Sequence, residues 1–172
     1  QKDQKHNRVI FFLSKNRKLI YNDVRKFGFI KLYKFTDKKR IPHLKNLGPE
    51  PLEKKWNFKY FKNYIVNKKR NIKNILMDQK FVSGLGNIYV NEILFLSGVK
   101  PSSEVKKLKD YKIKKIIKYS KIILRRSIKL GGSTIKDFSS ENGKKGVFQQ
   151  HLKIYGRKGK KCSNVDCNTT VV

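Results

Sequence analysis

A tight glycine turn between two apolar segments restricts the fold of this chain more than any other feature. The turn, Ser83-Gly84-Leu85-Gly86-Asn87, lies within residues 76–95, and helix-like apolar residues flank it on both sides. Glycine reaches positive φ and leaves backbone N–H groups exposed. Because the turn leads into a helix N-terminus, it is suited to hold a phosphate.

The charge of the chain indicates which molecule carries that phosphate. Lys and Arg number 43 against 12 Asp and Glu, a formal net charge of +31. Such an excess repels itself in the compact state unless a polyanion neutralises part of it, which favours DNA or RNA as the partner. Lysine is also a common surface residue in chains rich in Lys, Asn and Ile, so a plain solvated surface is the alternative.

Length and hydropathy indicate a soluble chain. The 172 residues suit one ordinary domain or two small ones, and 38% hydrophobic content can form a core. No run of about 18 uncharged apolar residues is present, and residues 1–5 lack the apolar region of a secretory signal. We therefore expect a cytoplasmic, monomeric protein without a membrane partner.

The first part of the chain has strand character. Residues 8–13, 18–21 and 27–33 are rich in β-forming residues, and residues 14–17 form a turn, which predicts a β-meander. Residues 47–52, Leu-Gly-Pro-Glu-Pro-Leu, can continue neither a helix nor a central strand. They mark the boundary to a helical part.

Helical spacing runs from about Trp56 to Phe138. Shorter helices are expected over residues 57–66, 71–81 and 88–97. A long helix is predicted by one apolar stripe with lysines opposite, made of Ile113, Ile116, Ile117, Ile123, Leu124 and Ile128. Gly131 and Gly132 would stop it. Thr134 with Asp137 is similar to a capping box that opens a short helix, and residues 147–155 look extended.

Six motifs follow one another in a specific order along the chain. They are Asp-Val-Arg-Lys-Phe-Gly at 23–28, residues 47–52, Met-Asp-Gln at 77–79, Gly-Asn-Ile-Tyr at 86–89, Gly-Gly-Ser-Thr at 131–134, and Val-Phe-Gln at 147–149 through Tyr-Gly-Arg at 155–157. In this order they resemble the formamidopyrimidine-DNA glycosylase family. The resemblance covers nearly the whole chain.

The resemblance implies an α+β fold in three parts. Residues 1–48 would end a β-sandwich, residues 49–155 would form a helix-two-turn-helix DNA-binding domain, and residues 156–172 would form a partial zinc-finger hairpin. It also implies a bacterial base-excision repair enzyme. Such an enzyme is a DNA glycosylase and abasic-site lyase that removes oxidised purines, namely formamidopyrimidine and 8-oxoguanine, from damaged double-stranded DNA.

The same resemblance implies a set of DNA-binding residues. Asn87 would contact a phosphate, although asparagine also caps helices well, and a cap for a helix that begins at Ile88 is the alternative. Phe27 would wedge between base pairs and Arg25 would point to the base left behind, whereas without the family a core strand residue and a surface charge are the simpler interpretations. The remaining positions are His6, Lys68, Lys73 and Tyr155.

A loop and the carboxylates complete the candidates. Residues 140–148 would cover an everted base, and a plain connector is the alternative. Asp78 and Glu92 have simpler explanations, such as an ion pair with a neighbouring lysine or a helix cap. The carboxylates form no catalytic pair, and the histidines lack metal-ligand spacing.

Departures from the family pattern bear on activity and zinc. The family's N-terminal proline, the glutamate after it and a later lysine are not among these residues, so we expect no catalytic residue and no glycosylase or lyase activity from the chain as given, which resembles an internal fragment. Cys162 and Cys167 supply two zinc ligands where the family has four, so we expect weak or no zinc binding.

Three alternatives to this enzyme class remain open. One is a non-catalytic DNA-binding protein derived from the family. Another is an endonuclease of the same superfamily that acts on oxidised pyrimidines. The third is a basic RNA-associated protein, which only the charge and the aromatic content support.

Overall fold

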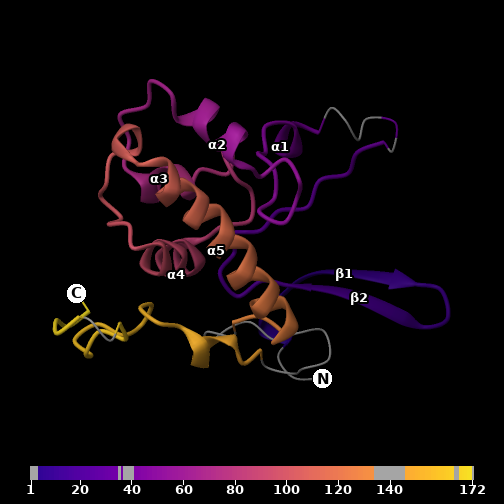
Figure 1. Ribbon diagram of the computed structural model, residues 1–172. Helices are drawn as coiled ribbons and strands as arrows, with labels where there is room; N and C mark the ends of the chain where they lie inside the picture. Colours follow the sequence, from indigo (N-terminus) through magenta and orange to yellow (C-terminus); the bar gives the residue numbers. More distant parts are fainter. Residues whose placement is uncertain (1–3, 35, 37–40, 134–145, 165–166, 172) are drawn as a thin grey trace. The chain divides into compact units, whose positions relative to one another are not determined.

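The computed structural model describes residues 4–34, 36, 41–133, 146–164 and 167–171 (Figure 1). Its contacts divide the chain into two compact units, Gln1–Ile41 and Pro42–Val172. Residues 42–48, which the sequence assigned to the first part, group with the second unit by their contacts. The division into three domains stays a prediction.

The first unit is built on a two-stranded antiparallel sheet. A short 3-10 helix, η1 (Gln4–His6), leads into β1 (Asn7–Leu13), which pairs with β2 (Arg17–Asn22). Lys15 and Asn16 at the tip both have positive φ, 59° and 54°, as a hairpin turn with the twist of its strands requires. The strands predicted at 8–13 and 18–21 are confirmed.

The third predicted strand, residues 27–33, is wrong. This described segment pairs with no strand. The carboxylate of Asp23 instead accepts the backbone N–H groups of Arg25, Lys26 and Gly28 at 3.0, 2.9 and 2.8 Å, and Lys26 has a φ of 57°. The chain therefore leaves β2 in a tight loop and does not turn back along the sheet edge.

The second unit is helical. Its helices are α1 (Pro42–Lys45), α2 (Phe58–Ile65), α3 (Ile72–Leu76), α4 (Asn87–Ser97) and α5 (Asp110–Lys129), with the 3-10 helices η3 (Val105–Lys107) and η4 (Phe148–His151). The sequence predicted α2, α4 and α5 well and missed the four-residue α1. The expectation that residues 147–155 are extended is wrong for the half that η4 occupies.

The buried stripe of α5 overlaps the predicted one but also includes two serines. Ile113, Ile116 and Ile123 are buried, but Ile128 is 67% exposed. Ser120 and Ser127 take the remaining inward positions and accept or share hydrogen bonds there. Trp56 Nε1 donates to Ser120 Oγ at 2.9 Å, and the Ser127 hydroxyl lies 2.6 Å from that of Tyr89. Each residue of an α-helix is rotated by about 100° from the one before it. Ile128, which follows the inward-facing Ser127, therefore faces solvent.

An aromatic cluster seats the segment before the glycine turn. The rings of Trp56, Phe61 and Phe81 meet at centroid distances of 5.0 to 5.5 Å, and all three side chains are fully buried. Tyr60 donates its hydroxyl to the carbonyl of Phe81 at 2.8 Å. Aromatic pairs with these tilted and edge-to-face geometries contribute beyond their buried area, so the start of the turn is firmly held.

The linker around Gly48 lies directly against this segment. Gly48 N–H donates to the carbonyl of Gln79 at 2.8 Å, and Ser83 N–H donates to that of Pro49 at 3.1 Å. A Cβ at position 48 would overlap the Phe81 carbonyl. As predicted, this linker is neither helix nor strand, and only glycine fits its close approach.

None of the described helices is long and apolar enough to cross a membrane. Gly131 and Gly132, with φ of 72° and 83°, follow α5 and stop it as predicted. The proposed capping box of Thr134 and Asp137 lies outside the described residues.

Candidate nucleic-acid interface

The connection between α3 and α4 begins earlier than the sequence suggested. The helix predicted over 71–81 ends at Leu76, because the chain closes on Asp78. The Asp78 carboxylate accepts the N–H of Lys80 at 3.0 Å, and its carbonyl accepts those of Phe81 and Val82. Partial burial raises the pKa of Asp78, but the Lys80 N–H and the Arg70 guanidinium, 3.0 Å away, outweigh it and hold that pKa below its usual value.

The side chain of Gln79 forms two hydrogen bonds with the backbone of the glycine turn. Its Oε1 accepts the N–H of Gly84 at 2.8 Å, and its Nε2 donates to the carbonyl of Leu85 at 3.0 Å. Gly84 has a φ of +82°, and no atom lies within 4 Å of where a Cβ would stand on Gly84 or Gly86. The outer side of the turn is therefore bare backbone that a ligand can approach closely.

Asn87 is the first residue of α4 and does not cap it. The N-cap is Gly86, without a side-chain hydrogen bond, so the alternative interpretation of Asn87 as the cap is wrong. The Asn87 side chain is exposed, and its Oδ1 accepts from Asn91 Nδ2 at 3.3 Å. Its amide nitrogen and the first-turn N–H groups of α4, which have no partner within the helix, make an anion-binding arrangement.

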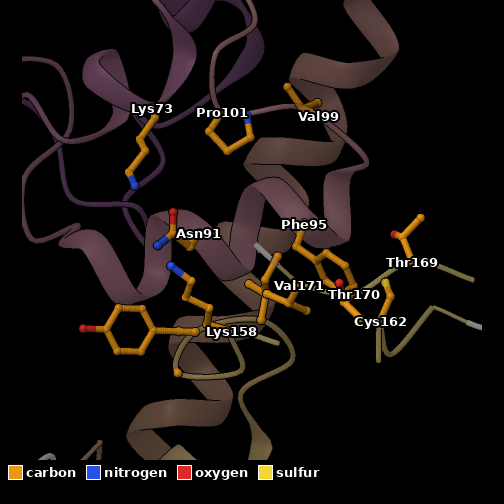
Figure 2. A pocket seen from close by; sticks show the side chains of 13 residues that line it. Lys73, Asn91, Phe95, Val99, Pro101, Lys158, Cys162, Thr169, Thr170 and Val171 are labelled. Carbon is orange, nitrogen blue, oxygen red and sulfur yellow. The ribbon is translucent and has the colours of Figure 1, made fainter. Parts of the chain in front are cut away.

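A cavity of about 490 Å³ lies beside α4 (Figure 2). Lys73 from α3 and Lys158 from the C-terminal segment extend toward Asn91 from opposite sides, as Figure 2 shows. Tyr155 also lines the cavity, and its lining residues include no carboxylate. The structure thus brings together Lys73 and Tyr155, both expected from the sequence. Lys158 was missed, although it follows the basic motif at 155–157.

Much of the remaining lining of this cavity is apolar. It is formed by Phe95, Val99, Pro101, Ile154 and Val171. Cationic groups backed by an apolar wall favour an anionic ligand, because neighbouring carboxylates do not neutralise them.

Glu92 joins α4 to the C-terminal segment. Its side chain is 3% exposed, and its carboxylate accepts three backbone N–H groups, from Lys153 at 2.7 Å and from Ile154 and Tyr155 at 2.9 Å. The sequence explained Glu92 as a lysine partner or a cap, and both explanations are wrong. One buried carboxylate thereby fixes where Tyr155 stands relative to α4.

Lys68 lies within the connection between α2 and α3. Its ammonium stands 4.4 Å from the centre of the Tyr64 ring, and its backbone N–H donates to the carbonyl of Ile65 at 3.1 Å. The side chain is half-buried. Its contact with DNA stays a prediction.

The other predicted residues belong to the first unit. The Arg25 guanidinium lies 4.9 Å from the centre of the Phe27 ring, and Phe27 is 78% exposed. The two side chains are together, as expected, but on a loop and not on a strand. His6 ends η1 half-buried, and its carbonyl accepts the Asp23 N–H at 3.0 Å.

The two cysteines lie on a short antiparallel ribbon. Lys161 pairs with Thr170, and Cys162 N–H donates to the carbonyl of Thr169 at 2.9 Å. Cys167 Sγ lies 3.1 Å from the Thr169 hydroxyl, which lowers the pKa of that thiol. No group of three or more His, Cys, Asp or Glu side chains gathers among the described residues. Two thiols do not fit a structural zinc site, which needs four ligands.

The segment that contains these helices matches a known family model. Residues 47–139 match the model described as the formamidopyrimidine-DNA glycosylase H2TH domain. The chain belongs to the formamidopyrimidine-DNA glycosylase family. This match confirms the family resemblance that the six motifs indicated, and it confirms the predicted helix-two-turn-helix architecture.

Individual family members align with nearly all of this chain. Formamidopyrimidine-DNA glycosylases of Rickettsia conorii and Rickettsia bellii are 40% and 41% identical to it over 171 and 170 residues. These matches include 99% and 98% of this chain. The chain spans about three fifths of the relatives' length, 62% and 61% respectively.

Solved family structures superpose closely. The MutM (Fpg) protein of Thermus thermophilus gives a TM-score of 0.88 at 31% identity, covering 98% of this chain and 63% of that one. Lactococcus lactis Fpg in complex with abasic-site DNA gives 0.87 at 35% identity, covering 99% and 61%. The loop predicted at 140–148 is described only from Gly146 onward, so its role stays a prediction.

Proposed function

We propose that these residues hold damaged double-stranded DNA during base excision. The observation that carries the proposal is the bare glycine turn with Asn87 exposed and not engaged as a cap. A Lactococcus lactis relative has been solved in complex with abasic-site DNA. In this chain the same turn would place N–H donors on a backbone phosphate, which positions the duplex without reading its sequence.

The cavity extends this contact along the strand. Lys73, Lys158 and Tyr155 would bind phosphates adjacent to the one at Asn87. Glu92 lies on α4, the helix that begins with Asn87, and its carboxylate holds the backbone of Tyr155. The contacts proposed for Asn87 and Tyr155 therefore keep a fixed spacing. Lys68 and His6 would add further contacts to the DNA backbone.

Recognition of the lesion would come from the first unit. Phe27 is exposed and carries Arg25 on its ring, so the pair can enter a duplex where a base has left the stack. Phe27 would fill the gap between base pairs, and Arg25 would donate to the unpaired base. The proposed lesions are oxidised purines, formamidopyrimidine and 8-oxoguanine.

The proposed reaction of the whole enzyme is glycosylase and abasic-site lyase chemistry. It requires an amine that attacks the sugar of the flipped nucleotide, with an acid beside it. The residues to which the resemblance assigns this chemistry are not among these 172. The part that we propose for these residues is therefore the binding of damaged DNA.

Asn87→Ala tests the binding half of the proposal. The variant should weaken binding to abasic-analogue and intact duplexes alike by about 1–2 kcal/mol, the value of one charge-assisted hydrogen bond. Its thermal stability should not change, because Gly86 is the cap. The matched control is Asn63→Ala, an exposed asparagine on α2, which should bind as the parent does. Equal affinity of the Asn87 variant and the parent would refute the phosphate contact.

Borohydride trapping on abasic duplex tests the catalytic half. No covalent adduct is expected from the purified chain. An adduct formed at an enzyme-like rate would identify a nucleophile among these residues, and peptide mapping would locate it.

A further inference from the structure

The outer face of α5 carries cations that the DNA site does not use. Lys115, Lys118, Arg125 and Lys129 are exposed there. At about 100° per residue they fall within an arc of about 80°, opposite the buried stripe of Ile113, Ile116 and Ile123. We call these four residues the outer face of α5.

Three of the other four cations of α5 differ because each has a partner, and the fourth, Lys121, is half-buried. Lys112 donates to the carbonyl of Gly98 at 2.7 Å, the Arg126 guanidinium lies 3.1 Å from His151 Nδ1, and the Lys114 ammonium stands 5.4 Å from the centre of the Phe58 ring. These contacts account for those three charges within the fold.

No carboxylate balances the outer face among the described residues. The single acidic residue of α5 is Asp110, and it pairs with Lys62 at 2.7 Å. The described ion pairs involve Lys62, Arg70, Lys106 and Lys107, and none of them includes the outer face. Its four cations therefore stand in solvent without an ionic partner in the described chain.

This arrangement costs helix stability. Lys115 and Lys118 are three residues apart and Arg125 and Lys129 are four apart, and such like-charge pairs destabilise a helix by about 0.2–0.5 kcal/mol each. In an ordinary solvent-facing helix, glutamates lie between the lysines, so that these pair interactions stabilise the helix. A polyanion laid along the face removes the repulsion and releases its own counterions.

The dimensions fit a duplex backbone. From Lys115 to Lys129 the face is about 21 Å long, which matches the rise of about six base pairs at about 3.4 Å each along the duplex axis. Single-stranded RNA is bound mainly by stacking on aromatic rings. On this side of α5, Tyr111 and Ile122 are the exposed large apolar residues, so the surface does not offer a row of rings.

The face points away from the glycine turn. α4 contacts α5 through Tyr89 and Ser127, and Ser127 belongs to the buried stripe. A duplex segment held at the N-terminus of α4 therefore lies on the other side of α5. We propose that the outer face of α5 binds the phosphate backbone of a second segment of duplex DNA, independently of sequence and lesion.

The test compares two variants that lose the same charge. One is the triple variant Lys118→Gln, Arg125→Gln, Lys129→Gln. Its control is Lys54→Gln, Lys55→Gln, Lys59→Gln, which changes three exposed lysines in and before α2. Gln, Lys and Arg have similar helix propensity, so both proteins should fold, and circular dichroism checks this.

The readout is the salt dependence of affinity for a long undamaged duplex. The outer-face variant should lower the slope of log K against log salt by about 2.7, or about 0.9 for each lost phosphate contact. The control should keep the parent slope. On a short duplex with one abasic analogue, which occupies only the turn, both variants should match the parent.

Three outcomes would overturn the proposal. Equal slope losses in both variants would mean that only net charge matters, and an unchanged slope in the outer-face variant would mean that the face is merely solvated. A loss seen with single-stranded RNA but not with duplex DNA would assign the face to RNA. On the short abasic duplex, which occupies only the turn, the Asn87→Ala variant tests the proposed function alone, so an unchanged affinity there would refute that function while this result stands.

Discussion

The two units differ in what stabilises them. The helical unit encloses a continuous core that includes Trp56, Phe61 and Phe81, with several side chains fully buried. In the first unit no described residue is buried, and apolar side chains such as Phe12 and Leu19 are exposed on the hairpin. A lone two-stranded hairpin is marginally stable in water, whereas a helical core of this kind stabilises itself.

The difference teaches how the candidate DNA contacts are held. Asn87, Lys73 and Tyr155 stand on elements that pack into the core or are tied to it by Glu92. Arg25 and Phe27 are positioned by local hydrogen bonds to Asp23. The proposed phosphate contacts are therefore preorganised, while the proposed lesion-sensing pair depends on one loop.

The largest expected effect comes from truncating the helical core. Phe61→Ala removes a fully buried ring that meets Phe81 at 5.0 Å, and it should lower the free energy of unfolding by about 3–5 kcal/mol. Phe12→Ala, the matched change at a hairpin ring that is 76% exposed, should change it by less than about 0.5 kcal/mol. Urea denaturation measures both. Similar losses would show that the hairpin has a core of its own.

Replacing the buried carboxylate should have the next largest effect. Glu92→Gln places a side-chain N–H donor where the carboxylate now accepts backbone N–H groups. It should lower the free energy of unfolding by about 2 kcal/mol. Hydrogen exchange should show faster exchange at Lys153, Ile154 and Tyr155 than in the parent. Glu104→Gln, which loses only exposed pairs to Lys106 and Lys107, should cost under about 1 kcal/mol. Unchanged exchange at the three amides would contradict the clamp.

DNA binding should separate the two units by substrate. Phe27→Ala should weaken binding to an abasic duplex by about 1–3 kcal/mol, the range of aromatic stacking on bases, and should leave intact duplex nearly unaffected. Asn87→Ala should weaken both equally. Fluorescence anisotropy with paired duplexes measures the ratio. If Phe27→Ala reduced both affinities alike, the ring would be a general contact and not a wedge.

The smallest expected effect is a pH dependence at the glycine turn. The pKa of Asp78 is held below its usual value in the folded state, so its ionised form stabilises the fold above the unfolded pKa of about 3.9. This stability, under about 1 kcal/mol for a partly exposed pair, is lost as the pH falls through the folded pKa. Thermal melts of the parent and Asp78→Asn at acidic pH measure it. The variant should show the shallower decline, and parallel curves would remove Asp78 from the account.

Local periodicity predicted most elements of the fold. The apolar stripe of α5 and the strands 8–13 and 18–21 depend on neighbouring residues, and they were found where expected. The segment 27–33 has strand composition, but a strand also needs a partner edge, and Asp23 diverts the chain. The composition of residues 27–33 does not reveal this diversion of the chain.

The candidate site shows the same division. The glycine turn and Asn87 are contiguous in sequence and were identified from it. Glu92 was misread because its three partners lie 61 to 63 residues farther along the chain. Lys158, which lines the cavity, follows the segment held by that long-range clamp. Residues whose role depends on distant backbone give no local signal.

The close packing of Gly48 couples the linker mechanically to the segment before the glycine turn. Gly48 and Pro49 are bonded to both sides of the segment that leads into the glycine turn, at Gln79 and at Ser83. Any tension carried along the linker therefore acts on the backbone of the proposed phosphate site, without passing through a side chain. Strain that the duplex imposes on the turn would travel back by the same two hydrogen bonds. A side chain at position 48 would separate the two backbones and disconnect them.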